Sequence, residues 1–324
     1  MYGPDLGIIL LPSTPVYQGA SASFFATIVA LGTRMITERD IAVLLAVVRY
    51  YVLNRVQIQR LCFPADPSGR IARRRIQALV DFKYINRTQM QVVNPSAGSP
   101  APLYYPAQKG CEFLAEYCND ERFLATPTQT PQNHHLFHWL AVSEAHIVLD
   151  QAIAAEQEAH VVDWLSEWDV ANHDEPTPEK RYRIYTLIHE SPRLVCAPDA
   201  AFLLAMSGHQ KVFYLEQDRN TSGVHQVAAS KSPGYATMAE RHLHRKHFPT
   251  TTLDKFSVLM IAPSERRRDA LKKAMREKVG AGLWRFASVT DLTRESFLRA
   301  PIWHLCDGEP SPLIKPTATE GTPG

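Results

Sequence analysis

The stretch CAPDAAFLLAMSGHQKVFYLEQDRNTSG, residues 196–223, contains two apolar runs that predict a pair of β-strands joined by a tight turn. Each run has acids at one end: Asp199 precedes the first, and Glu216 and Asp218 close the second. Burying an unpaired carboxylate is costly, so a metal ion, a basic partner or an exposed strand end must relieve the cost. The period of two along a strand places Glu216 and Asp218 on one face, where they repel each other unless paired or metal-bound.

The whole chain has the size and composition of a two-domain globular protein. It has 324 residues, of which 45% are hydrophobic and 21% charged. The net charge is only +2, so any surface for nucleic acid must be a local one. Five cysteines stand apart without a CxxC pair, which indicates reduced thiols and a cytoplasmic protein. No apolar run is long enough to span a bilayer, so we expect no membrane partner.

Residues 35–120 predict an N-terminal DNA-binding domain. Thr37 is a plausible N-cap for a first helix, and two further helices, a hairpin with a Pro/Gly/Ser tip and a fourth helix follow. Three helices followed by a hairpin are typical of a winged helix-turn-helix, whose third helix enters the major groove. The third helix buries one apolar face, and its arginine-rich opposite face predicts DNA contacts by Arg70, Arg73, Arg74, Arg75 and Gln77. A solvated face and a protein-binding winged helix are the alternatives.

The rest of the chain is organised around a second domain. Residues 1–34 lack a clear period and predict a flexible leader, with the natural start open between Met1 and Met35. The Pro-rich segment 121–132 predicts a linker, residues 133–310 an α/β domain, and 311–324 a flexible tail. Within the α/β domain we expect a long helix from His134, a helix beginning after Pro233, and a helix capped by Ser264.

The acid-bearing strands resemble the PD-(D/E)XK nuclease superfamily through Pro198-Asp199 and, after a hairpin, Glu216-Gln217-Asp218. The resemblance implies that a restriction-endonuclease-like α/β domain follows the winged helix in the sequence. The fold class of the whole chain is then α+β / α/β. It also implies that Asp199 and Glu216 hold Mg²⁺ or Mn²⁺, with Glu144 of the long helix as a third metal ligand.

The sequence departs from that superfamily at one position, because Asp218 stands where a lysine is expected. Lys231 is available on the following segment, four residues before Tyr235, as in the Q-x-x-x-Y element of some members. The implied catalytic set is therefore Asp199, Glu216, Asp218 and Lys231. Pairing of the acids with Arg219 or Lys211 is the alternative, so the sequence leaves open whether the chain is a Mg²⁺-dependent endodeoxyribonuclease or has a degenerate core.

The order of motifs along residues 38–310 resembles the replication-relaxation family of bacterial mobile elements. The motifs are LYYPAQKGCEFLA, HHLFHWLAVSEA, WLSEWD, APDAAFLL, YLEQDRNT and KSPGY. The resemblance implies a role in replication, relaxation or mobilisation of plasmids or integrative elements, with double-stranded DNA and other replication or mobilisation proteins as partners. A non-catalytic transcriptional regulator or relaxosome accessory protein is the alternative. Neither the recognised DNA sequence nor the oligomeric state follows from the sequence.

Overall fold

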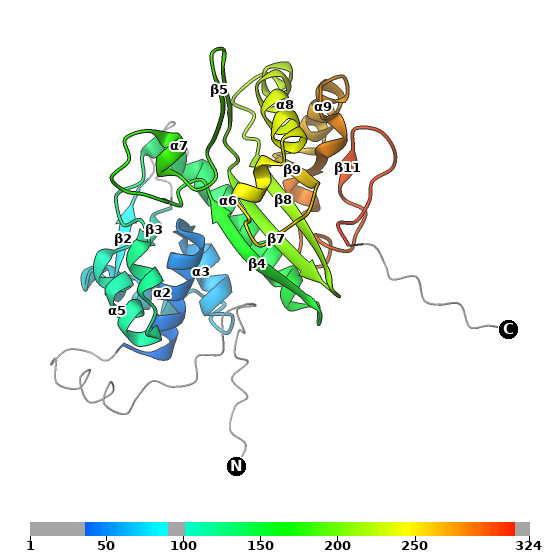
Figure 1. Cartoon of the computed structure of the whole chain (residues 1–324). Coiled ribbons are helices and arrows are strands. Elements are labelled where there is room, and N and C mark those ends of the chain that lie inside the picture. The colour runs from blue at the N-terminus through cyan, green and yellow to red at the C-terminus, as the bar shows by residue number, and fades with distance from the viewer. Residues whose placement is uncertain (1–35, 90–100, 315–324) are drawn as a thin grey trace. The chain divides into compact units, whose positions relative to one another are not determined.

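The computed structural model describes residues 36–89 and 101–314. These residues form two compact units that divide between Ile147 and Val148 (Figure 1), and each unit is described by itself. The division falls inside helix α6 (Asn133–Ala154), and not in the 121–132 segment that its composition predicts as a linker. That segment instead contains a short 3₁₀ helix, η2 (Glu121–Ala125), which packs against helix α5.

Among the described residues, the N-terminal unit combines four whole helices and the first part of α6 with a small antiparallel sheet. Its helices are α2 (Glu38–Tyr50), α3 (Arg55–Cys62), α4 (Arg70–Asp81) and α5 (Gln108–Cys118). Its strands are β1 (Leu53–Asn54), β2 (Ile85–Thr88) and β3 (Leu103–Pro106), in the order β1-β3-β2. Thr37 caps α2, as predicted, and forms a capping box with Asp40. Most of the predicted hairpin tip lies outside the described residues.

Helix α4 packs its predicted apolar face into the core of this unit. Ala72, Ile76 and Leu79 are buried there together with side chains of α2 and α3. The spacing of these three residues is that of one helix face, so burying them turns the opposite face of α4 to solvent. The arginines of that face are described with the candidate site below.

The C-terminal unit is built on a six-stranded mixed sheet in the order β11-β10-β9-β8-β7-β4. The strands are β4 (Ala159–Ser166), β7 (Ala200–Met206), β8 (His209–Gln217), β9 (Phe256–Ala262), β10 (Trp284–Ser288) and β11 (His304–Leu305). Neighbours among β4, β7 and β8 are antiparallel, β9 and β10 run parallel to β8, and β11 pairs antiparallel with β10. The central strands are continuous apolar runs, as expected where a sheet is covered on both faces.

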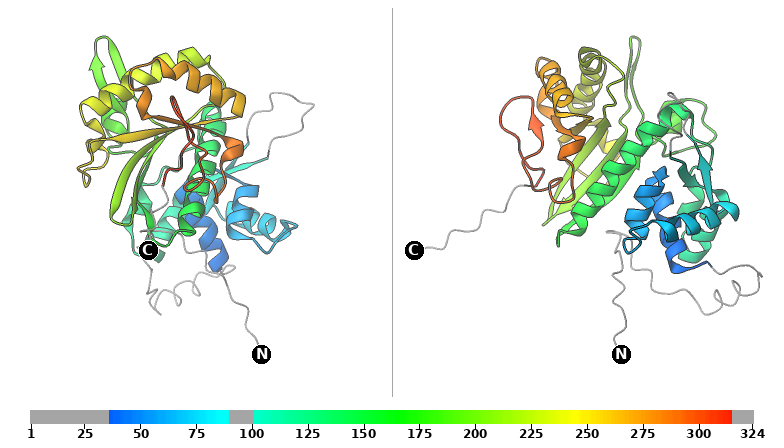
Figure 2. Two further views of the ribbon diagram at one scale, coloured as in Figure 1. Left: turned by 90° about the vertical axis from the view of Figure 1, so that its right-hand side faces the viewer. Right: turned by 180° about the vertical axis from the view of Figure 1, so that it is seen from behind.

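Helices α8 (Val224–Glu240) and α9 (Glu265–Arg276) lie side by side on one face of this sheet (Figures 1 and 2). The core beneath them contains Tyr214, Tyr235, Phe256 and Trp284. The chain between β4 and β7 forms helix α7 (Pro178–Arg181) and a hairpin of β5 (Thr186–Glu190) and β6 (Arg193–Cys196), which packs against α8. Three 3₁₀ turns complete the unit: η3 (Leu243–Lys246), η4 (Ala281–Leu283) and η5 (Val289–Asp291).

The prediction that a helix begins after Pro233 is wrong, because α8 begins at Val224 and contains Pro233. Proline removes one backbone hydrogen bond from a helix interior, yet tight packing holds this helix together. A Cβ atom at Gly234 would lie 2.8 Å from the carbonyl oxygen of Val195 in β6, so glycine lets the two backbones approach closely. Ser264 caps α9 as predicted.

The chain termini agree only in part with the sequence expectations. Ser311 exchanges backbone hydrogen bonds with Trp303, so the start of the predicted tail, 311–314, is packed against the C-terminal unit. The predicted leader and residues 315–324 lie outside the described residues. All five cysteines are free, as predicted, and all five are buried. Within the described ranges, no helix is long and apolar enough to cross a membrane.

Candidate functional site

The pairing of β7 with β8 brings two of the predicted acids together. Ala200 pairs with Leu215, and the backbone N–H of Asp199, one residue before β7, donates to the carbonyl oxygen of the same Leu215 at 3.1 Å. This bond departs by one residue from the register of the two strands, as at a β-bulge, and it holds Asp199 beside the end of β8 that contains Glu216. Both residues are buried, and the two carboxylates interact electrostatically.

Helix α8 supplies a partner to each carboxylate oxygen of Glu216. The ammonium nitrogen of Lys231 lies 2.6 Å from Oε2, and the hydroxyl of Tyr235 donates to Oε1 at 2.6 Å. Lys231 and Tyr235 are four residues apart and therefore share one helix face. Burial raises the pKa of Glu216 to about 7, although the Lys231 ammonium opposes that shift.

Lys231 is the basic residue of the site. Its side chain is 33% exposed, and its ammonium also donates to the carbonyl oxygen of Ala197 at 3.4 Å. Burial alone would lower the pKa of Lys231, but the nearby carboxylates of Glu216 and Asp199 outweigh burial and raise it. Lys231 is therefore protonated near neutral pH and balances part of the negative charge.

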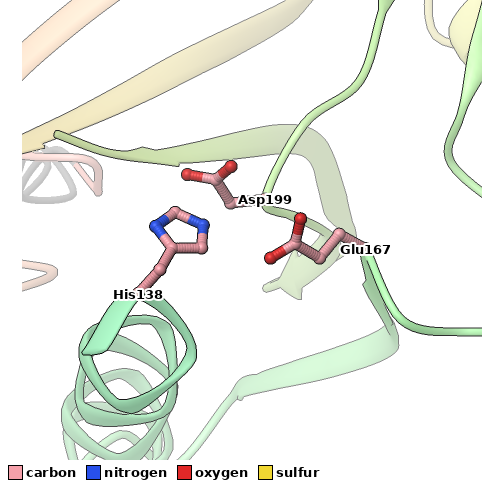
Figure 3. Close-up of side chains that lie close together, drawn as sticks. All are labelled: His138, Glu167 and Asp199. Carbon is pink, nitrogen blue, oxygen red and sulfur yellow. The ribbon is translucent and has the colours of Figure 1, made fainter. Parts of the chain in front are cut away.

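Glu167 is a third acid at the same end of the strands, and the sequence analysis missed it. It directly follows β4, and its backbone N–H donates to the carbonyl oxygen of Asp199 at 3.0 Å. A carboxylate oxygen of Glu167 lies within 4.8 Å of one of Asp199 (Figure 3). His138, labelled in the same figure, belongs to the N-terminal unit. The signal for Glu167 was present in the sequence, because this acid belongs to the WLSEWD motif at residues 164–169.

Asp199 is held in place by the backbone of β8. Its Oδ2 accepts a hydrogen bond of 2.6 Å from the backbone N–H of Gln217. Hydrogen bonds from backbone N–H groups to a carboxylate favour its ionised form. The carboxylates of Asp199 and Glu216 thus lie near the ammonium of Lys231, and the carboxylate of Glu167 lies beside that of Asp199. The site has three acids and one lysine.

Asp218 is paired elsewhere. Arg267 of α9 binds it through two hydrogen bonds, from Nε to Oδ2 at 2.8 Å and from Nη2 to Oδ1 at 2.9 Å. Oδ2 also accepts from the backbone N–H of Asn220 at 3.1 Å. The side chains of Asp218 and Arg267 are 5% and 11% exposed, so this ion pair joins β8 to α9 as part of the interior. We therefore place Asp218 with the structural residues, with Arg267 as its charged partner.

Glu144 is likewise engaged outside this acid group. It lies on the part of α6 that belongs to the N-terminal unit, where Arg60 and Gln57 of α3 each donate to its carboxylate at 2.8 Å. The structure thus gives this residue a charged partner of its own, and the candidate site is built without it.

The five residues predicted to contact DNA on α4 fall into two groups. Arg70, Arg73 and Arg74 are exposed, and in the part of the chain that the structure describes their guanidinium groups have no hydrogen-bond or ion-pair partner. Arg75 instead binds the buried carboxylate of Asp40, with Nε to Oδ1 at 2.8 Å. Gln77 donates to Asp81 at 2.7 Å and accepts from Arg87 at 3.3 Å. Only the first group is free to bind a ligand without breaking an existing contact.

Comparison with known proteins gives one match. The model of the replication-relaxation family matches residues 44–252, more than half of the chain. The matched range begins within α2 and extends past α8, so it includes α4 and all the acids of the site. No curated protein and no solved structure matches the chain significantly.

Proposed function

This chain belongs to the replication-relaxation family, and from that premise we propose that it binds duplex DNA of a mobile element and cleaves it with a divalent cation. The observation that carries the proposal is that Asp199, just before β7, and Glu216, near the end of β8, both lie close to Lys231 in the middle of α8. Membership of the family suggests that the protein acts on DNA during replication or relaxation. The three residues suggest that this action is cleavage of a phosphodiester bond.

The topology of the N-terminal unit supports a winged helix-turn-helix as its DNA-binding part. The element order α2-β1-α3-α4-β2-β3, with sheet order β1-β3-β2, is that of three helices followed by a hairpin. Helix α4 is then the recognition helix, and the exposed arginines at 70, 73 and 74, which have no partner within residues 36–89 and 101–314, suit phosphate oxygens and guanine edges.

The topology of the C-terminal unit supports a restriction-endonuclease-like core. A helix precedes three antiparallel strands, β4, β7 and β8, and a second helix, α8, leads to β9, which runs parallel to β8. Asp199 lies just before the second of these strands and Glu216 on the third, an arrangement that agrees with the sequence resemblance to the PD-(D/E)XK superfamily.

The residues of the site fit a divalent cation. Asp199 and Glu216 offer oxygen ligands close enough for their charges to interact, and with Glu167 they exceed the single positive charge of Lys231. Mg²⁺ and Mn²⁺ prefer such ligands. A cation held there would polarise a phosphodiester and lower the pKa of a water molecule. Tyr235 orients the Glu216 carboxylate, and the part-exposed ammonium of Lys231 is placed to contact a phosphate oxygen.

A nicking assay tests the proposal. Supercoiled plasmid is incubated with the protein and Mg²⁺ or Mn²⁺, and open-circular product is measured for wild type, Asp199→Asn and Glu216→Gln. Glu265→Gln, an exposed acid on α9, is the matched control. We expect nicking by wild type and the control, and a loss of at least a hundredfold in the two site variants. If nicking persists in Asp199→Asn, the assigned chemistry is wrong.

A non-catalytic DNA-binding regulator or relaxosome accessory protein is the second candidate. The observation that favours it is that both carboxylate oxygens of Glu216 already have partners, Lys231 and Tyr235. An intact plasmid in every metal, together with a persistent gel shift of duplex DNA, would establish this candidate in place of the nuclease.

A further inference from the structure

Helix α4 presents an isoleucine on its solvent side among its arginines. Ile71, in the first turn, is 48% exposed, whereas its neighbour Ala72 is completely buried. Residues three apart are neighbours on a helix surface, so Ile71 lies next to Arg74. An apolar side chain there is flanked by guanidinium groups that have no partner among the described residues.

The backbone that carries Ile71 is firmly held. The Oδ2 atom of Asp66 accepts from the backbone N–H of Ala72 at 2.9 Å, and Gln59 of α3 donates to the carbonyl oxygen of Asp66 at 2.7 Å. Gly69 turns the chain into α4 with φ of 63°, and a Cβ atom there would lie 2.4 Å from Gln59 Oε1. Side chains that read a ligand need such a fixed backbone.

A thymine methyl group is the partner that this combination fits. In the major groove the C5-methyl of thymine is the characteristic apolar contact, while arginine binds guanine edges or phosphates. An apolar protein partner fits less well, because burying Ile71 against it would also desolvate the neighbouring guanidinium groups. We infer that α4 reads a thymine through Ile71, beside a guanine or phosphate bound by Arg74; this rests on the proposed binding of duplex DNA.

The test compares thymine with uracil, which lacks only this methyl group. A preferred duplex is first selected from a random pool with wild-type protein, and each thymine is then replaced singly by uracil. Affinities are measured by fluorescence anisotropy at about 0.15 M salt. Burying one methyl group corresponds to about a fourfold change in affinity. We expect this loss at one position for wild type and no discrimination there by Ile71→Ala. The control is Val279→Ala, whose 62% exposed valine lies in the C-terminal unit and which should discriminate like wild type.

The outcomes separate the two proposals. If no duplex binds the protein, the proposed DNA-binding function fails and the inference fails with it. If duplex binds but no position distinguishes thymine from uracil, the inference is overturned and DNA binding stands. It is also overturned if Ile71→Ala retains the full thymine preference.

Discussion

Replacing Asp218 with asparagine is expected to destabilise the C-terminal unit strongly, because the substitution leaves the Arg267 guanidinium buried without its counter-charge. Arg267 keeps its hydrogen bond to the carbonyl oxygen of Ser222, at 2.7 Å, and the amide oxygen of the asparagine can still accept one bond, but no negative charge remains beside it. Removing one partner of a buried ion pair costs about 3–5 kcal/mol. In a unit of this size each kcal/mol shifts the melting temperature by about 2–4 °C, so we expect a decrease of roughly 6–20 °C.

Tryptophan fluorescence during thermal unfolding measures this effect, since four of the five tryptophans, at 164, 168, 284 and 303, lie in the C-terminal unit. The double variant Asp218→Asn/Arg267→Gln has no uncompensated charge, so it should be more stable than the sum of the single effects predicts, by about 1–3 kcal/mol. Asp269→Asn is the matched control. Its carboxylate, 58% exposed, pairs with Arg268, and its loss should cost less than about 1 kcal/mol.

A result close to wild type would refute this reasoning. If Asp218→Asn melts within about 2 °C of wild type, or if the two single effects simply add, the ion pair does not hold β8 to α9. If the variant is stable yet loses nicking, Asp218 would return to the catalytic set that the sequence resemblance implies.

Three further predictions follow from other contacts. Arg74→Ala should weaken binding of duplex DNA and reduce the slope of log affinity against log salt concentration by about 1, without changing the melting temperature. Arg75→Ala should instead lower the melting temperature, because it leaves the buried carboxylate of Asp40 without its ion-pair partner. Burial lowers the pKa of His247 to about 4. As the pH falls, this imidazole is therefore protonated at a higher pH in the unfolded chain than in the folded chain. Stability should therefore fall by about 3 kcal/mol as the pH drops from about 6.5 to 4, and a pH series of unfolding should show a flatter slope for His247→Gln. Gly234→Ala should cost about 1–3 kcal/mol by overpacking against β6, while Gly282→Ala, with no atom within 4 Å of the added Cβ, should be nearly neutral in the same denaturation assay.

Local patterns in the sequence predict much of the architecture. The caps at Thr37 and Ser264 mark helix starts, and the apolar spacing in α4 identifies its buried face. A short hairpin between two apolar strands makes them antiparallel neighbours, so the approach of Asp199 to Glu216 follows from sequence. These features depend on residues close together in the chain, where periodicity and turn chemistry carry the information.

Partners distant in sequence cannot be predicted in the same way. Asp218 binds Arg267, which is 49 residues away in the sequence, and Glu144 binds Arg60, which is 84 residues away. Each pair forms only because separate helices and strands pack together. In the sequence, Arg75 resembles the neighbouring arginines of α4, which face solvent. It nevertheless binds the buried carboxylate of Asp40, because α2 packs beside α4. No local pattern distinguishes an arginine with such a partner from one without.

The Pro233-Gly234 pair shows how a local rule misleads at the site itself. Both residues favour breaking a helix, and a break would separate Lys231 from Tyr235. In the structure the helix continues, so these two side chains share a face and bind the two oxygens of Glu216. Gly234 permits this because it lets α8 approach β6, the strand that leads directly to Asp199. Lys231 thereby provides from α8 the positive charge that β8 lacks at Asp218. The absence of a strand lysine is therefore no argument against catalysis, and the choice between nuclease and inactive core depends on whether a divalent cation can share Glu216 with Lys231.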